Sequence, residues 1–317
     1  RDHCVTGVQT CALPISLTFN NEGGQVSAAV TTGTLLVLSS ATPITSVNQS
    51  QVSTPGISGP LQFSAANPVI TVNSGLADTG LTISAVISNG GNLTLTKAGA
   101  GMLALSGANT FTTGLNLDAG GLMFAANSTP TSGTITSGPV GTGTLRLAGG
   151  TTLMSDGTVR TIGNAVTVNG DFAFGGRTAG AGVILTGAIN LGNANRTIGV
   201  ATPGVTATLN GLLTTSAAGT GLTKSGDGIL LLGAANTDAN FGGAGIVVAG
   251  GLLRDGVTNA VPAGSLLTMS AGAGFDLNGF DQTLNAVGGA GFITNSSLTT
   301  RDRKSTRLNS SHTVISY

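Results

Sequence analysis

Two stretches far apart in the chain have nearly the same sequence, and this repeat limits the possible folds more than any other feature. "LTKAGAGMLALSGANT" at 95–110 aligns with "LTKSGDGILLLGAANT" at 222–237, with lysine, glycine, leucine and asparagine in the same places. Both copies lead to "AGGL", at 119–122 and 249–252. A repeat built from short apolar pieces indicates a solenoid, because each unit can bury its apolar face only against its neighbours.

The pieces that repeat have the pattern of strands. Apolar and small polar residues alternate in short segments such as "NLTLT" (92–96), "GTLRL" (143–147) and "AVTVNG" (165–170), and a period of two is typical of a half-buried strand. Glycine makes up 52 of the 317 residues, and glycine and asparagine suit the turns between such strands. The sequence therefore predicts an all-β fold, a parallel β-helix (β-solenoid) of about 11–13 coils with roughly 20–30 residues in each.

The alternation also predicts which side chains face the core. Within the repeats, leucines that recur every second residue are expected to point inward between like neighbours. These leucines are Leu103, Leu105, Leu230 and Leu232. Thr94 and Thr96 are expected to be more exposed than Leu93 and Leu95, which alternate with them.

The two ends of the chain differ in composition from the rest, and we interpret them as not native. The rarest residue types gather there: Cys4, Cys11, His3, His312 and Tyr317. One permitted choice of codons for residues 1–15, read as its reverse complement, translates into residues 302–316 in order. The nucleotide string also resembles a library adapter used in short-read sequencing. We therefore expect 1–15 and 302–317 to be adapter-derived artefacts that imply no disulfide and no metal site.

The repeat resembles the passenger-associated transport repeat, also called the autotransporter-associated β-strand repeat. That family has the same order of lysine, two glycines, two leucines and Asn-Thr, then an aromatic residue and a closing Ala-Gly-x-Leu. The first copy has Phe111 at the aromatic position, whereas the second has Asp238 there and three extra residues before "AGGL". The resemblance implies that 16–301 is a fragment of a right-handed β-helix passenger, with repeats near 93–125 and 220–256.

The resemblance also implies a function and a location. It predicts a non-catalytic, surface-exposed or secreted stalk or adhesin-like region of an autotransporter from a Gram-negative bacterium, which assists its own export by folding outside the cell. Expected partners are host or neighbouring-cell surfaces, matrix or glycans, and a translocator β-barrel in a missing C-terminal part that anchors the chain in the outer membrane. A signal peptide is expected in a missing N-terminal part.

Charge and hydropathy limit the classes of partner that the chain is expected to bind. Only 8% of the residues are charged, and the 12 basic and 12 acidic residues balance, so the basic footprint of a nucleic-acid-binding protein is missing. The longest apolar run, "GILLLGAA", is much shorter than the roughly 18 residues of a membrane span. We therefore expect no nucleic-acid partner and no membrane span in this fragment.

Five polar residues of the repeats and turns are candidates for function, and we assign structural roles to all of them. Lys97 and Lys224 occupy matching positions, so we expect them to cap coil edges and discourage strand addition rather than to act as catalytic amines. Asn109, Asn236 and Asn278 are expected to bind the backbone of turns, in part as stacked ladders.

The alternative function is a carbohydrate-active β-helix enzyme, a polysaccharide lyase or a glycoside hydrolase. Hydrolysis needs two carboxyl groups roughly 5–10 Å apart, and Asp276 and Asp281, beside Asn278, are the nearest acidic pair. The segment "AGAGFDLNG" at 271–279 partly imitates a calcium-binding nonapeptide, but only one copy is present. The chain has no tryptophan to stack on sugar. We therefore predict no enzyme, and no catalytic, cofactor-binding or metal-binding residues.

Overall fold

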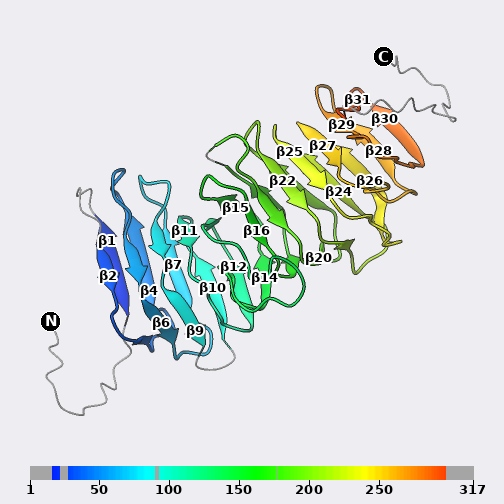
Figure 1. Cartoon of the computed structure of the whole chain (residues 1–317). Coiled ribbons are helices and arrows are strands. Elements are labelled where there is room, and N and C mark those ends of the chain that lie inside the picture. Colours follow the sequence, from blue (N-terminus) through cyan, green and yellow to red (C-terminus); the bar gives the residue numbers. More distant parts are fainter. Residues whose placement is uncertain (1–15, 22–27, 90–92, 177, 298–317) are drawn as a thin grey trace, which may run out of the picture.

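The computed structural model describes residues 16–21, 28–89, 93–176 and 178–297. These segments form a rod of stacked coils built from 31 strands (Figure 1). Every pairing between named strands is parallel and joins a strand to the strand one coil away, as in β1 with β4 and β4 with β7. The predicted all-β solenoid is confirmed. The two adapter-derived segments predicted at 1–15 and 302–317 lie outside the described residues.

The strands stack into sheets that form the faces of the rod. Sheet 1 has nine strands: β1 (Leu17–Asn21), β4 (Ile44–Asn48), β7 (Val69–Asn73), β10 (Thr94–Ala98), β12 (Gly114–Leu117), β14 (Thr144–Leu147), β17 (Val166–Val168), β20 (Ile189–Asn190) and β23 (Leu213–Thr214). Sheet 2 has twelve: β2 (Ala29–Thr31), β5 (Gly56–Ser58), β8 (Leu81–Ile83), β11 (Met102–Leu105), β13 (Gly121–Phe124), β15 (Thr151–Ser155), β18 (Phe172–Phe174), β21 (Arg196–Val200), β24 (Thr220–Ser225), β26 (Phe241–Val248), β28 (Leu266–Met269) and β30 (Ala286–Gly289).

The third position in each coil is shared by two shorter sheets. Sheet 3a has three strands near the N-terminal end: β3 (Leu36–Leu38), β6 (Pro60–Phe63) and β9 (Val86–Asn89). Sheet 3b has seven strands toward the C-terminal end: β16 (Arg160–Ile162), β19 (Val183–Leu185), β22 (Thr206–Leu209), β25 (Ile229–Leu232), β27 (Leu252–Asp255), β29 (Gly274–Asp276) and β31 (Phe292–Thr294).

The number and length of the coils agree with the sequence-based prediction. The twelve strands of sheet 2 are separated by eleven steps from coil to coil, so the described rod has about 11 turns. Residues in register on neighbouring coils are 18 to 31 positions apart, as for Gly274 with Phe292 (292 − 274) and Gly121 with Thr152 (152 − 121). Neighbouring strands are spaced by roughly 4.8 Å, so each coil adds that much to the rod.

Aliphatic side chains form continuous columns inside the rod. The four leucines predicted to face inward are each 0% exposed: Leu103, Leu105, Leu230 and Leu232. Thr94 and Thr96 are half-buried, whereas Leu93 and Leu95 are buried, as predicted. Leu103 is in register with Leu81 on one side and Leu122 on the other, so like residues pack on like. Burying one such side chain stabilises the fold by about 1.5–3 kcal/mol.

The two copies of the repeat lie on different faces, which their sequences do not reveal. In the first copy β10 and β11 meet at the corner between sheets 1 and 2, whereas in the second copy β24 and β25 meet at the corner between sheets 2 and 3b. The 127 residues that separate Lys97 from Lys224 (224 − 97) are therefore not a whole number of coils. The repeat specifies one strand, one corner and the next strand, and this unit fits either corner of the rod.

Candidate functional site

Both repeat lysines lie inside the rod, and the prediction that they cap coil edges is wrong. Lys97 and Lys224 are each 0% exposed. Lys97 occupies a place in an aliphatic column, in register with Ile70 and Leu117. Each lysine belongs to the inward-facing side of its strand because it lies two residues after a buried leucine. Strand alternation alone predicts that the lysine side chain points inward. The hydrogen bonds of its ammonium group offset the cost of removing the charge from water.

Each ammonium group joins the carbonyl groups of two successive corners. Nζ of Lys97 donates to the carbonyl oxygen of Gly99 (2.7 Å) in its own coil and of Ala119 (3.0 Å) in the next coil. Nζ of Lys224 donates to the carbonyl oxygens of Gly226, in its own corner, and Gly250 (2.9 Å), in the next. Each lysine therefore supplies donors to inward-pointing carbonyl groups that have no strand partner, and it links adjacent coils.

Glycine is required at the corner because of backbone geometry and close packing. Gly99 has φ of +78° and Gly226 has φ of +76°, a region that residues with a Cβ rarely adopt. A Cβ at Gly99 would lie 2.4 Å from the carbonyl oxygen of Val72, and a Cβ at Gly226 would lie 2.4 Å from that of Val200. At both corners, a backbone carbonyl group of the preceding coil therefore leaves no room for a Cβ atom. This shared geometry explains the shared lysine and glycine pattern of the repeat.

Burial changes the acid–base properties of the two lysines. Desolvation lowers the pKa of Lys97 to about 8. Desolvation also lowers the pKa of Lys224 to about 8, with a small opposing effect of Asp227. A lysine with a lowered pKa is a feature of some active sites, but neither side chain is exposed. A substrate in solution therefore cannot reach either amine.

The repeat asparagines bind backbone groups of the coils before and after them, but one partner of each, Ile87 or Leu213, lies in a strand and not in a turn as predicted. Oδ1 of Asn109 accepts from the backbone N–H of Ile87 (2.8 Å), and its Nδ2 donates to the carbonyl oxygen of Pro139 (3.0 Å). Asn236 makes the same two kinds of bond, to the N–H of Leu213 (2.8 Å) and the carbonyl of Ala260 (2.6 Å).

The two asparagines lie where sheets end, a role that the sequence did not indicate. Ile87 belongs to β9, the last strand of sheet 3a, and Leu213 belongs to β23, the last strand of sheet 1. In each case an asparagine side chain replaces the next strand as the partner of a backbone N–H. Each copy of the repeat therefore closes one sheet while the rod continues.

Two further observations bear on the asparagine predictions. Asn278 has φ of +46° and its Nδ2 donates to the carbonyl oxygen of Asp255 (3.0 Å), so it binds backbone at the end of a strand in the preceding coil and not turn backbone as predicted. A stacked pair of side chains occurs at Asn21 and Asn48, where Nδ2 of the first donates to Oδ1 of the second (2.8 Å). Sequence reasoning missed this pair because neither residue belongs to the repeat.

The acidic pair proposed from the sequence is not brought together as a surface site. Asp276 is 0% exposed, and its carboxylate accepts hydrogen bonds from Nε of Arg254 (2.7 Å) and Oγ of Ser296 (2.6 Å). Burial raises the pKa of Asp276, but hydrogen bonds from Ser296, Asn278 and Arg254 outweigh this effect and leave the pKa below its usual value. Asp281 is exposed in the following turn.

The acidic residue coupled to Asp276 is Asp255, which sequence reasoning missed. Asp255 is 0% exposed at the end of β27, and neither of its carboxyl oxygens has a hydrogen-bond partner. Burial, together with the smaller effect of the negative charge of Asp276, raises the pKa of Asp255 to about 8. The signal available in the sequence was its spacing, because Asp255 lies two residues after the buried Leu253.

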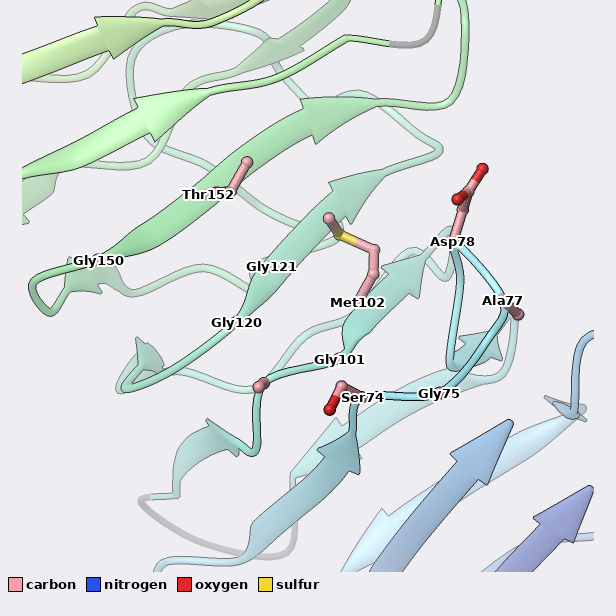
Figure 2. A pocket seen from close by; sticks show the side chains of 11 residues that line it. Ser74, Gly75, Ala77, Asp78, Gly101, Met102, Gly120, Gly121, Gly150 and Thr152 are labelled. Carbon is pink, nitrogen blue, oxygen red and sulfur yellow. The ribbon is translucent and has the colours of Figure 1, made fainter. Parts of the chain in front are cut away.

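Two depressions on the surface of the described rod are lined by few ionisable side chains. The larger one, of about 450 Å³, lies at the corner between sheets 1 and 2, and glycines form much of its wall (Figure 2). Asp78 is its one ionisable side chain, and Met102 contributes a thioether to the wall. A second depression, of about 380 Å³ near Ile135, is lined by no ionisable residue. Among the described residues, no three His, Cys, Asp or Glu side chains gather closely enough to hold a metal ion.

Comparison with known proteins identifies the repeats. The model of the passenger-associated-transport-repeat family matches residues 95–123 and 222–254. No curated protein and no solved structure matches the chain. Within the described segments, no helix has the length and apolar character needed to cross a membrane. The chain is a β-solenoid that carries two copies of the passenger-associated transport repeat, the repeat of autotransporter passengers.

Proposed function

We propose that this solenoid is a non-catalytic stalk or adhesin-like region of an autotransporter passenger, exposed on the surface of a Gram-negative cell or secreted from it. The observation that supports the proposal most is the uniform connection of each coil to the next by parallel strand pairs. An array of this kind forms a long, stiff rod. Such a rod can hold other segments of a protein away from the membrane.

The contacts inside the rod suit a chain that folds as it emerges. Each coil contacts mainly its neighbours, so folding can start at one coil and add others in sequence. The lysine corners and asparagine bridges add links between adjacent coils, as from Lys97 to Ala119. Burial of each new set of aliphatic side chains is favourable. Coil-by-coil folding outside the cell can therefore help to draw the following chain across the outer membrane.

The proposed partners are surfaces rather than small substrates. We place host or neighbouring-cell surfaces, matrix and glycans in this class, and we exclude nucleic acid because the 12 basic and 12 acidic residues balance. The enzyme alternative loses its main support because Asp276 is buried and held by Arg254 and Ser296. A carboxylate in that position cannot contact a polymer in solution.

The proposal is tested by measuring export. The chain is placed between a signal peptide and an outer-membrane translocator, and its display on intact cells is measured by sensitivity to added protease. Leu105→Asp places a carboxylate in the core and should lower display several-fold, because the coil cannot close. Thr94→Asp, on the outer side of a strand, is the matched control and should leave display unchanged. Equal display of both variants would contradict a role of coil folding in export.

A further inference from the structure

Asp255 interrupts a column of leucine side chains near the C-terminal end of the described rod. In sheet 3b, Leu209 is in register with Leu232, and Leu232 is in register with Asp255. Leu232 and Asp255 are both 0% exposed. A carboxyl group therefore takes the place of an isobutyl group in the core, where its burial without a hydrogen bond is costly.

The surroundings of Asp255 provide no partner for a negative charge. Neither carboxyl oxygen has a hydrogen-bond partner. The strand on one side, β25, has only aliphatic residues, and the strand on the other, β29, contributes the negative Asp276. Among the described residues of β25, β27 and β29 the one cation is Arg254, and its guanidinium is bound to Asp276 (2.7 Å).

The adjoining turns do not provide a positive charge to balance a carboxylate at Asp255 either. The turn 256–265 has no charged residue, and the turn 277–285 has only Asp281, which is exposed. Asn278 donates to the backbone carbonyl of Asp255, not to its carboxyl group. The site accepts a neutral carboxylic acid and opposes a carboxylate.

We propose that Asp255 makes the coils around β27 a pH-sensitive unit of the rod, which stays closed in acidic surroundings and opens locally as the solution becomes neutral. The position of the group in the leucine column and its two unpartnered oxygens carry this inference. Because a solenoid coil contacts mainly its neighbours, the opening remains local. The first copy of the repeat, at 93–125, lies several coils away along the rod, so it should not be affected.

The sign of the effect follows from proton binding. The pKa of Asp255 is raised from 3.8 to about 8 in the folded coil. Between about pH 4 and pH 8 the opened coil therefore releases a proton that the closed coil keeps. The equilibrium constant for opening rises by up to about tenfold for each pH unit in this range. The buried lysines do not contribute there, because their pKa values of about 8 place their titration at higher pH.

Hydrogen exchange on the full chain between pH 5 and pH 8 tests the proposal. Exchange rates are corrected for the intrinsic effect of pH, and peptides covering 252–276 are compared with peptides covering 93–125. We expect the opening constant of 252–276 to increase at least tenfold over this range, with less than a twofold change in 93–125. The latter region also reports whether each variant is folded.

Two variants and one control separate the cause from general effects of charge. Asp255→Leu continues the leucine column and Asp255→Asn keeps the shape without the ionisation, and both should remove the pH dependence. Asp118→Asn, at an exposed position, should behave as the unchanged chain. A pH dependence that persists in both Asp255 variants, that is missing from the unchanged chain, or that is equal along the whole rod would overturn the proposal.

Discussion

Nζ of Lys97 and the carbonyl oxygen of Ala119, which lies one coil farther along the rod, are joined by a hydrogen bond of 3.0 Å. Lys224 makes the equivalent bond to Gly250 (2.9 Å) at a different corner of the rod. An internal cation thus links adjacent coils in both copies of the repeat. The lysine is a buried part of the corner itself and not a surface charge.

Lys97→Met and Lys224→Met should each destabilise the coils at their own corner. The thioether side chain fills the column, but the inward carbonyl groups lose their donors, which costs about 1–3 kcal/mol for each buried group left unpaired. Removal of a buried charge offsets part of this loss, so we expect a net loss of about 1–3 kcal/mol in local stability. Hydrogen exchange of 93–125 and 220–256 measures it. Thr96→Met, on the outer side of β10, is the control, and an unchanged corner in both lysine variants would contradict the role of the ammonium group.

The lysines should also make the rod more stable in alkaline solution. Their pKa values are lowered from 10.5 to about 8 in the fold, so below pH 8 both folded and unfolded chains are protonated and the full cost of the buried charge is present. Between about pH 8 and pH 10.5 the unfolded chain holds more protons than the folded chain, and the free energy of unfolding rises by up to about 1.4 kcal/mol per pH unit for each lysine.

Urea denaturation from pH 8 to pH 10 checks this dependence on the lysines. The unchanged chain should have a higher denaturation midpoint at pH 10 than at pH 8.5. The double variant Lys97→Met with Lys224→Met should show a flatter profile, because the two titrating groups are gone. A profile of the same slope in both proteins would show that other groups cause the effect.

Asn109→Ala should be among the most damaging polar substitutions in the repeat. It removes the partners of the Ile87 N–H and the Pro139 carbonyl inside the rod, at about 1–3 kcal/mol for each group left unsatisfied. Thermal unfolding should therefore show a clear decrease in Tm. Asn190→Ala, at an exposed position, should change Tm little, and similar losses in the two variants would refute the role as a sheet-ending partner.

The chain should not degrade polysaccharides. Its one proposed carboxylate pair is divided between a buried Asp276 and an exposed Asp281. Incubation with pectin and alginate, followed by assays for reducing ends and unsaturated products, should show no turnover. Activity that the chain possesses and that Asp281→Ala removes would contradict this prediction.

The sequence predicted the parts of this molecule that depend on alternation and repetition. The inward positions of Leu103 and Leu232 follow from a period of two, and the solenoid follows from the matching of the two repeats. The burial of Lys97 follows from the same alternation, but a general rule about charged residues at edges pointed the other way. Its carbonyl partners become visible only when two coils are stacked.

Other features depend on contacts between coils that no local pattern encodes. The shift of the second repeat to another corner depends on the summed lengths of all intervening turns. The role of Asn236 depends on where sheet 1 ends, which is a property of the coils around it. Asp255 is not recognisable from acids that are close in sequence, because Asp276, the acid that interacts with it, lies across one coil.

The most direct test of the account is whether damage to one coil stays local. Leu232→Asp places an unpaired carboxylate in a column where Leu209 and Asp255 are its neighbours in register, and the lost packing and buried charge should cost several kcal/mol, about 2–5 from the packing alone. Hydrogen exchange of this variant, measured along the whole chain, should show protection lost around 207–256 and largely retained at 93–125. Uniform loss of protection along the rod would contradict a solenoid whose coils are held by their neighbours.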